Sequence, residues 1–316
     1  MYYHISRAQV ESIVFEGAGI RGIAYGGVLK VLEERDMIKD IKKTGGTSAG
    51  AITALALSVG YSAEEIDSLI FHTNFKKFND GRNVFVGGTH RLYKKFGWYR
   101  GKRFTDWVGK IIEVKTGNAD ITFEELVQKG YKELYITGTC LNQQKLIVFS
   151  HFTYPHMKVK DAVRISISIP LYFEAVWIDK KGKVYAKDNG ECDLMVDGGV
   201  LANFPIRIFD TVINNNRIPN MKTIGIRVDS DEQIEADKAD KNLIRYPVKK
   251  LKDYAGAFYT ILLENSNRAV LTEYDWKRTV SVSSKSIGPR IRKLHPGQKQ
   301  LLIKSGEDAM KEYLKK

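Results

Sequence analysis

The sequence contains little cysteine and no long apolar run. These shortages argue against a disulfide-rich protein and against a protein that spans a membrane. Cys140 and Cys192 are the two cysteines in 316 residues, too few for a disulfide framework. Six histidines form no close pair with metal-ligand spacing. The most apolar stretch, 49–60, is shorter than the roughly 20 residues that span a bilayer, and residues 1–10 lack the apolar stretch of a secretory signal. We therefore expect reduced cysteines, no metal site and a cytoplasmic protein whose contact with any membrane is peripheral.

The chain is basic, with 50 Lys and Arg against 37 Asp and Glu and a net charge of +13. Such a surface attracts anionic partners, either nucleic acid or an acidic membrane face. The net charge alone does not show whether the basic residues bind such a partner or only keep the protein soluble. Because no nucleic-acid-binding motif is present, we expect no nucleic acid partner.

The order of apolar segments indicates an α/β protein. Ser12–Phe15 is a short apolar strand, Gly17–Gly22 is a glycine-rich turn, and apolar residues recur at helical spacing up to about residue 34. A second strand is predicted over 38–44 and a buried helix over 49–59. Further strands are predicted at 131–140, 146–152, 172–178, 183–186, 194–196, 223–228 and 280–282, and helices at 63–71, 159–168, 248–274 and 296–314. We expect loops at 72–103 and 229–245.

Gly46-Thr47-Ser48-Ala49-Gly50 matches G-x-S-x-G at a predicted strand-to-helix turn. This motif exposes a nucleophilic serine on a sharp turn, where the glycines let strand and helix pass close together. The alternative is a serine that only caps the helix.

Gly17-Ala18-Gly19-Ile20-Arg21-Gly22 matches G-x-G-x-x-G after the first strand. The turn could cradle a dinucleotide phosphate, or its N–H groups could stabilise an oxyanion. It could also be no more than a tight turn.

Asp197-Gly198-Gly199 follows a short predicted strand. A carboxylate there can orient or deprotonate a hydroxyl, although Asp-Gly is also a common turn. We expect the three motifs to meet because the carboxyl ends of parallel strands lie at one edge of a sheet.

The three motifs in this order resemble the patatin-like phospholipase family. The Ser166–Phe173 segment, Ser-Ile-Ser-Ile-Pro-Leu-Tyr-Phe, resembles a fourth block of that family. Two positions depart from the family pattern: Glu16 replaces an aspartate, and Ala18 replaces a middle glycine. The resemblance covers residues 12–210, which we expect to form the catalytic domain. We expect residues 211–316 to form a helical C-terminal portion packed on the same domain.

The resemblance implies a three-layer fold with a mostly parallel central sheet flanked by helices. It also implies a lipid acyl hydrolase of the phospholipase A or lysophospholipase type that needs no cofactor and acts on phospholipid or another lipid ester. Ser48 would attack the ester, Asp197 would accept its proton, and amides of the Gly17–Gly22 turn would hold the oxyanion. Arg21 would support that turn or bind the lipid phosphate. The resemblance does not say whether a partner activates the enzyme.

Three other interpretations compete with this one. A Ser-His-Asp α/β-hydrolase would use His295, the one histidine that follows Asp197. A dinucleotide oxidoreductase needs an acidic residue about 20 positions past the glycine turn, and Asp40 is near that spacing but precedes a strand. A non-catalytic lipid- or nucleic-acid-binding module would use the net charge of +13 and the aromatic residues of the 72–103 segment.

Residues 91–103 alternate basic and aromatic side chains. The segment could be a cap that docks on acidic lipid, since basic residues and Trp or Tyr favour the head-group layer. The alternative, which we favour, is that its aromatics are buried core residues and its cations are solvated.

Overall fold

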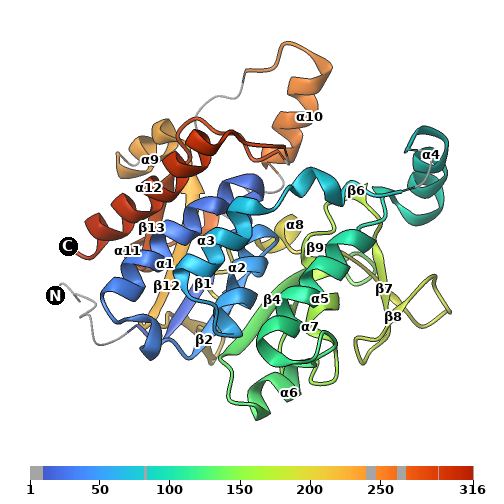
Figure 1. Ribbon diagram of the computed structural model, residues 1–316, viewed down its shortest axis with the longest axis horizontal. Coiled ribbons are helices and arrows are strands. Elements are labelled where there is room, and N and C mark those ends of the chain that lie inside the picture. The colour runs from blue at the N-terminus through green and yellow to red at the C-terminus, as the bar shows by residue number, and fades with distance from the viewer. Residues whose placement is uncertain (1–9, 82–83, 240–246, 262–267, 291, 316) are drawn as a thin grey trace.

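The computed structural model of the chain describes residues 10–81, 84–239, 247–261, 268–290 and 292–315. In this part of the chain, nine strands form one sheet in the order β13-β12-β1-β2-β4-β9-β7-β8, with β5 also paired to β4. The pairings from β13 to β4 are parallel, and those of β5, β9, β7 and β8 are antiparallel. The sheet is therefore mixed and mostly parallel at its centre (Figure 1).

The strands of this sheet are β1 (Ser12–Phe15), β2 (Lys43–Gly46), β4 (Glu133–Cys140), β5 (Lys145–Phe149), β7 (Val176–Ile178), β8 (Val184–Tyr185), β9 (Asp193–Asp197), β12 (Thr223–Asp229) and β13 (Thr279–Ser283). Two small sheets pair β3 (Gly97–Tyr99) with β6 (Leu171–Phe173) and β10 (Thr211–Ile213) with β11 (Asn216–Ile218). Every residue of β1 and β12 is buried, as expected for strands covered on both faces.

The α-helices are α1 (Ala24–Glu34), α2 (Ala49–Ser58), α3 (Ala63–His72), α4 (Val84–Lys95), α5 (Lys102–Thr116), α6 (Phe123–Gln128), α7 (Val159–Ser166), α8 (Gly199–Ala202), α9 (Asp231–Lys238), α10 (Leu251–Thr260), α11 (Glu273–Lys277) and α12 (Pro296–Tyr313). The 3-10 helices are η1 (Gly19–Ile23), η2 (Ile38–Asp40), η3 (Phe75–Phe78) and η5 (Arg268–Val270). None of the described helices is long and apolar enough to cross a membrane.

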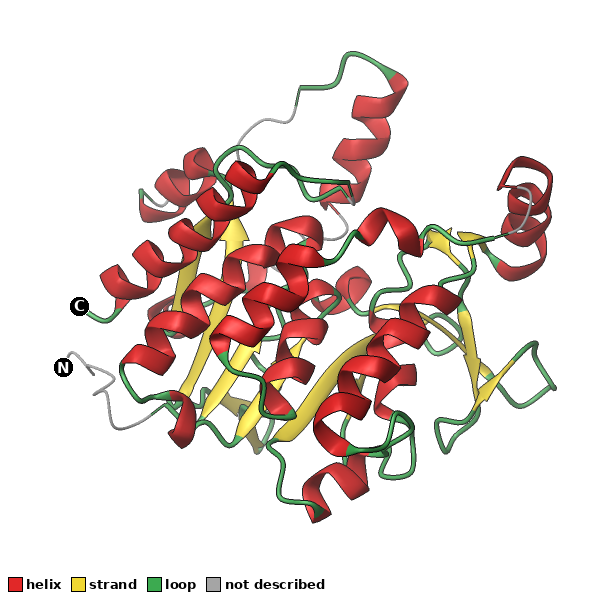
Figure 2. Cartoon of the chain, viewed as in Figure 1, coloured by secondary structure: helices red, strands yellow, loops and turns green. Residues whose placement is uncertain are grey.

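The helices form layers on the sheet (Figure 2). α1, α2, α3 and α12 cover the face toward the viewer, and α12 packs along α1. On the opposite face, the 204–209 segment packs against the sheet, since Phe204 and Ile206 contact Gly225 of β12 and Ile208 contacts Gly45 of β2. The three-layer α/β fold predicted from the sequence is confirmed.

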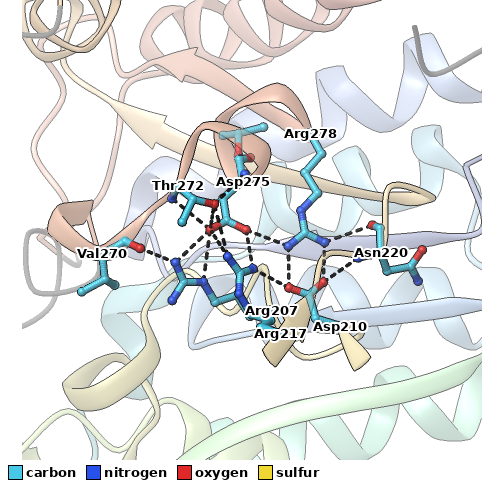
Figure 3. A network of polar contacts seen from close by, with 9 residues as sticks. Arg207, Asp210, Arg217, Asn220, Val270, Thr272, Asp275 and Arg278 are labelled. Atoms are coloured by element: carbon cyan, nitrogen blue, oxygen red, sulfur yellow. Dashed lines mark hydrogen bonds and ion pairs between the residues drawn. The ribbon is translucent and has the colours of Figure 1, made fainter. Parts of the chain in front are cut away.

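Residues beyond 210 complete this sheet, because β12 lies between β1 and β13. A buried ion network secures them to one another (Figure 3). Asp275 of α11 accepts hydrogen bonds from Arg207, Arg217 and Arg278, and Asp210 pairs with Arg217 and Arg278. Burial alone would raise the pKa of Asp275, but the hydrogen bonds from Arg217 and Arg278 outweigh it and lower this pKa.

Several predicted segments are wrong in the structure. The 72–103 segment is not a long loop, because it contains η3, α4 and β3. The second strand begins at Lys43, after η2, and the predicted 229–245 loop contains α9. The predicted helix over 248–274 is divided into α10, η5 and α11. Residues 82–83, 240–246 and 262–267, on which parts of these predictions fall, lie outside the described residues.

Candidate active site

Ser48 stands on the turn between β2 and α2 with φ 52° and ψ −118°. A positive φ is costly for a residue other than glycine and is often found at functional sites. Gly46 and Gly50 make the turn possible, because a Cβ on Gly46 would collide with Gly50 and a Cβ on Gly50 would collide with the carbonyl of Phe15. The geometry is that of a nucleophile elbow.

Asp197 ends β9 and is 1% exposed. Its Oδ1 accepts the N–H of Gly199 at 2.7 Å, and the side chain of Ser48 is near enough to its carboxylate to lower its pKa. Burial raises the pKa of Asp197 to about 7, although the Gly199 N–H and the Ser48 side chain act to lower it. Such a carboxyl exchanges protons near neutral pH, unlike an exposed aspartate.

The strand arrangement that brings Asp197 close to Ser48 differs from the predicted one. β9 runs antiparallel to β4, so the carboxyl end of β9 does not share an edge with the carboxyl ends of the parallel strands. Instead β9 stops part-way along β4, where Asp197 pairs with Gly138. Gly46 at the end of β2 pairs with Ile136, two residues earlier on β4. Asp197 thus lies just beyond the end of β2, at the level of Ser48.

The Gly17–Gly22 turn lies beside Ser48 and is held from two sides. The N–H of Gly17 donates to the carbonyl of Asn203 at 2.9 Å, and the Asn203 side chain donates to the carbonyl of Gly17 at 2.8 Å. The N–H of Ile20 donates to the carbonyl of Pro289 at 3.1 Å. Within the described residues, the N–H groups of Ala18 and Gly19 have no hydrogen-bond partner. These two N–H groups are the ones available to an anion at this turn.

The charged side chains in and next to this turn, Arg21 and Glu16, are buried. Arg21 is buried, and its Nε donates to the carbonyl of Ala18 at 3.2 Å, which supports the turn. Glu16 accepts the N–H of Val228 at 3.0 Å and lies 3.4 Å from the guanidinium of Arg227. Glu16 therefore ties the start of the turn to β12.

The Ser166–Phe173 segment contacts both candidate residues. Ser166 Oγ accepts the N–H of Ser48 at 2.9 Å, and the carbonyl of Ser168 accepts the N–H of Asp197 at 2.9 Å. The buried guanidinium of Arg164 donates to Ser168 Oγ and to the carbonyl of Glu174. The resemblance had singled out this segment without assigning it a role, and its contacts hold Ser48 and Asp197 in position.

A pocket opens next to Ser48, and apart from Ser48 its lining residues carry no polar side chain. They are Gly19, Ile20, Ala49, Ile52, Phe75, Phe78, Phe104, Ile167, Ile169 and Phe173. Phe78, Phe104 and Trp107 also pack on one another with ring centroids 5.2–5.7 Å apart. Sequence reasoning missed this wall, in part because Phe75 and Phe78 lie in a segment predicted to be a loop. A pocket of this kind suits a hydrocarbon chain.

The residues of the competing interpretations lie elsewhere. His295 is exposed and caps α12, where its Nδ1 accepts the N–H of Gly297 at 3.3 Å. Asp40 is exposed at the end of η2 and precedes β2. No group of His, Cys, Asp and Glu in the described part of the chain could hold a metal ion. The cysteines are free and buried.

The cations of the 91–103 segment are largely engaged within the protein. Arg91 is buried and donates to the carbonyl of Trp98 at 2.9 Å, and Lys95 pairs with Glu174 at 3.6 Å. Lys102 pairs with Asp106 at 2.9 Å. Trp98 lies against Gly88 of α4, so this aromatic residue packs within the protein.

Comparisons with known proteins bear on the family and the fold of the chain. A family model described as patatin-like phospholipase matches residues 13–210. An uncharacterized mimivirus protein, R571, is 28% identical over 98% of this chain and 95% of its own length. A probable lipid hydrolase of Invertebrate iridescent virus 6, 463L, is 27% identical over 63% of this chain, and the match spans 62% of the viral protein.

A solved structure, VipD from Legionella pneumophila, has the same fold. The two superpose with a TM-score of 0.62 over 97% of this chain and 67% of VipD. Their sequences are 15% identical.

Proposed function

The chain belongs to the patatin-like phospholipase family, and on this basis we propose that it hydrolyses lipid esters through Ser48 and Asp197. The observation that carries the proposal is that the Ser48 side chain acts on the pKa of a buried Asp197 beside an apolar pocket. Membership of a lipid hydrolase family makes a lipid the substrate class, and the two residues supply the chemistry.

In the first step, Ser48 Oγ attacks the ester carbonyl carbon while Asp197 takes the hydroxyl proton. The raised pKa of Asp197 supports this role, because a base with a pKa near 7 accepts a proton more readily than an ordinary aspartate and is still substantially ionised at neutral pH. The proton on Asp197 then passes to the departing alkoxide, which leaves as the alcohol. An acyl group remains on Ser48.

The N–H groups of Ala18 and Gly19 are our candidates for holding the oxyanion of the tetrahedral intermediate. Both lack a partner within the described residues, and the turn that carries them approaches the side chain of Ser48. Because the turn is fixed at Asn203 and Pro289, these donors are already positioned when the charge develops. Preorganised donors of this kind contribute much of the transition-state stabilisation in acyl transfer.

The apolar pocket would hold the acyl chain, which places the ester carbonyl at Ser48. In the second step, water attacks the carbonyl carbon of the acyl-enzyme while Asp197 takes a proton from it. This proton then passes to Ser48 Oγ as the carboxylic acid leaves. These steps use no cofactor. Residues 12–210 would supply the reacting groups, and residues 211–316 would contribute through Pro289, which braces the oxyanion turn.

Hydrolysis of a phosphatidylcholine and of a short-chain ester by wild-type and Ser48→Ala protein tests this proposal. We expect the variant to lose measurable turnover on both substrates while its melting temperature is unchanged. A fluorophosphonate probe should label the wild type at Ser48 and leave the variant unlabelled. Turnover by Ser48→Ala at the wild-type rate would overturn the proposal.

A further inference from the structure

Helix α10 has a large apolar face that is exposed to solvent. The side chains at intervals of three or four residues are Leu251 (83% exposed), Tyr254 (63%), Phe258 (59%) and Ile261 (59%). This spacing places all four on one side of a helix. In Figure 1, α10 projects from the upper edge of the molecule, away from the helical layers. Large contiguous exposed apolar patches mark interaction sites far more often than isolated exposed residues do.

Exposed cations precede this helix and also lie in a second segment of the chain. Lys249 and Lys250 immediately precede α10, and Arg290, Arg292 and Lys293 lie in the segment between β13 and α12. Within the described residues, none of these five side chains forms an ion pair, in contrast to Lys95 and Lys102. Apolar side chains with unpaired cations beside them, as Lys249 and Lys250 are beside α10, are the composition that binds at a lipid–water interface.

The 290–293 cations lie next to the candidate active site. Pro289, the residue before Arg290, accepts the N–H of Ile20 at 3.1 Å and contacts Gly19. Both Gly19 and Ile20 line the apolar pocket. A negatively charged surface drawn to Arg290 and its neighbours would therefore be brought to the mouth of this pocket.

We propose that the apolar face of α10 and the cations at 249–250 and 290–293 bind the surface of an anionic lipid bilayer. The inference rests on the proposed function, in that it states how the enzyme reaches an aggregated lipid substrate. A second copy of the chain fits this surface poorly, because each copy carries a net charge of +13. Nucleic acid would satisfy the cations and leave the four apolar side chains exposed.

Sedimentation with vesicles tests the proposal independently of catalysis. The vesicles are pure phosphatidylcholine, or equal parts of phosphatidylcholine and phosphatidylserine. One variant combines Leu251→Ser with Phe258→Ser, and the other combines Arg290→Gln, Arg292→Gln and Lys293→Gln. A basic residue contributes about fivefold to binding at an anionic surface, so the triple variant should bind the mixed vesicles on the order of a hundredfold more weakly. The apolar variant should lose binding to both kinds of vesicle.

A matched control removes three other exposed cations, Lys180, Lys181 and Lys187, in and beside the β7–β8 hairpin. This variant should bind the mixed vesicles much as the wild type does. Both test variants should hydrolyse a soluble short-chain ester at the wild-type rate. Wild-type binding by either test variant, or an equal loss in the hairpin control, overturns the proposed surface. Failure of the wild type to hydrolyse the soluble ester instead counts against the proposed function and leaves the binding result standing.

Discussion

The backbone N–H of Ser48 donates a hydrogen bond of 2.9 Å to Oγ of Ser166, across 118 residues of sequence. Ser48 holds φ at 52°, a conformation that costs on the order of 1–3 kcal/mol for a residue other than glycine. Ser166 is fully buried at the end of α7. The bond therefore satisfies an N–H at the turn and fixes the conformation that exposes the Ser48 hydroxyl.

We expect Ser166→Ala to lower kcat for a short-chain ester about five- to tenfold with little change in KM. Losing one hydrogen bond of this kind costs about 1 kcal/mol, and the loss falls on the position of the nucleophile. Ser58→Ala is the control, because Ser58 is also buried and bonds a backbone carbonyl, at the far end of α2. Steady-state kinetics and melting temperatures of the two variants separate positioning from stability. Equal kcat values in both would contradict the positioning role.

Asp197→Asn should lower kcat by at least about a hundredfold, whereas His295→Ala should leave it within about twofold of the wild type. An amide cannot accept the proton of Ser48, and His295 only caps α12. The melting temperature of Asp197→Asn should hold or rise, since the amide removes a buried charge. Comparable kinetic losses in two folded variants would favour a Ser-His-Asp triad instead.

The pH dependence of kcat/KM should follow the ionisation of Asp197. The base must be unprotonated, so activity on an uncharged short-chain ester should rise as pH increases through about 7. The folded-state pKa lies above that of an unfolded aspartate, so the contribution of Asp197 to stability is present at low pH and declines from about pH 4 to about pH 7.

The carboxyl group of Glu16 has a pKa in the same range, so the pH profile needs a control at this residue. Burial also raises the pKa of Glu16 to about 7, but its side chain bonds Val228 and Arg227. Glu16→Gln should therefore keep the rising limb of the pH profile near 7. A wild-type profile that is flat between about pH 5 and 8 would show that no group with this pKa serves as the base.

The sequence predicted the local features of the site better than the way they assemble. The elbow at Ser48 depends on residues 46–50, whose glycines and buried helix are adjacent in sequence, so the pattern was sufficient. The position of Asp197 depends on the antiparallel register of β9 against β4, a long-range pairing that local periodicity does not encode. The bracing of the Gly17–Gly22 turn by Pro289 is equally long-range.

Two errors in secondary structure have local causes. α4 carries the glycine pair 87–88, which lowers helix propensity, but Gly88 is the position against which Trp98 packs. The apolar spacing of 248–274 indicated one helix, but Leu271 and Thr272 lie outside any helix and the Thr272 side chain caps the start of α11.

The ion network of Figure 3 gives the last prediction, which concerns stability. Asp275→Asn should lower the free energy of unfolding by about 3–5 kcal/mol, because it leaves the guanidinium of Arg278 buried with one of its two carboxylate partners gone. Asp106→Asn breaks an exposed pair with Lys102 and should cost less than about 1 kcal/mol. Urea denaturation of both variants measures the difference. The hydrogen bonds hold the pKa of Asp275 below that of an unfolded aspartate, so its contribution is complete above about pH 4 and is lost as pH falls further. If Asp275→Asn were no more destabilising than Asp106→Asn, this network would not be what secures α11 and β13 to the β10–β11 hairpin.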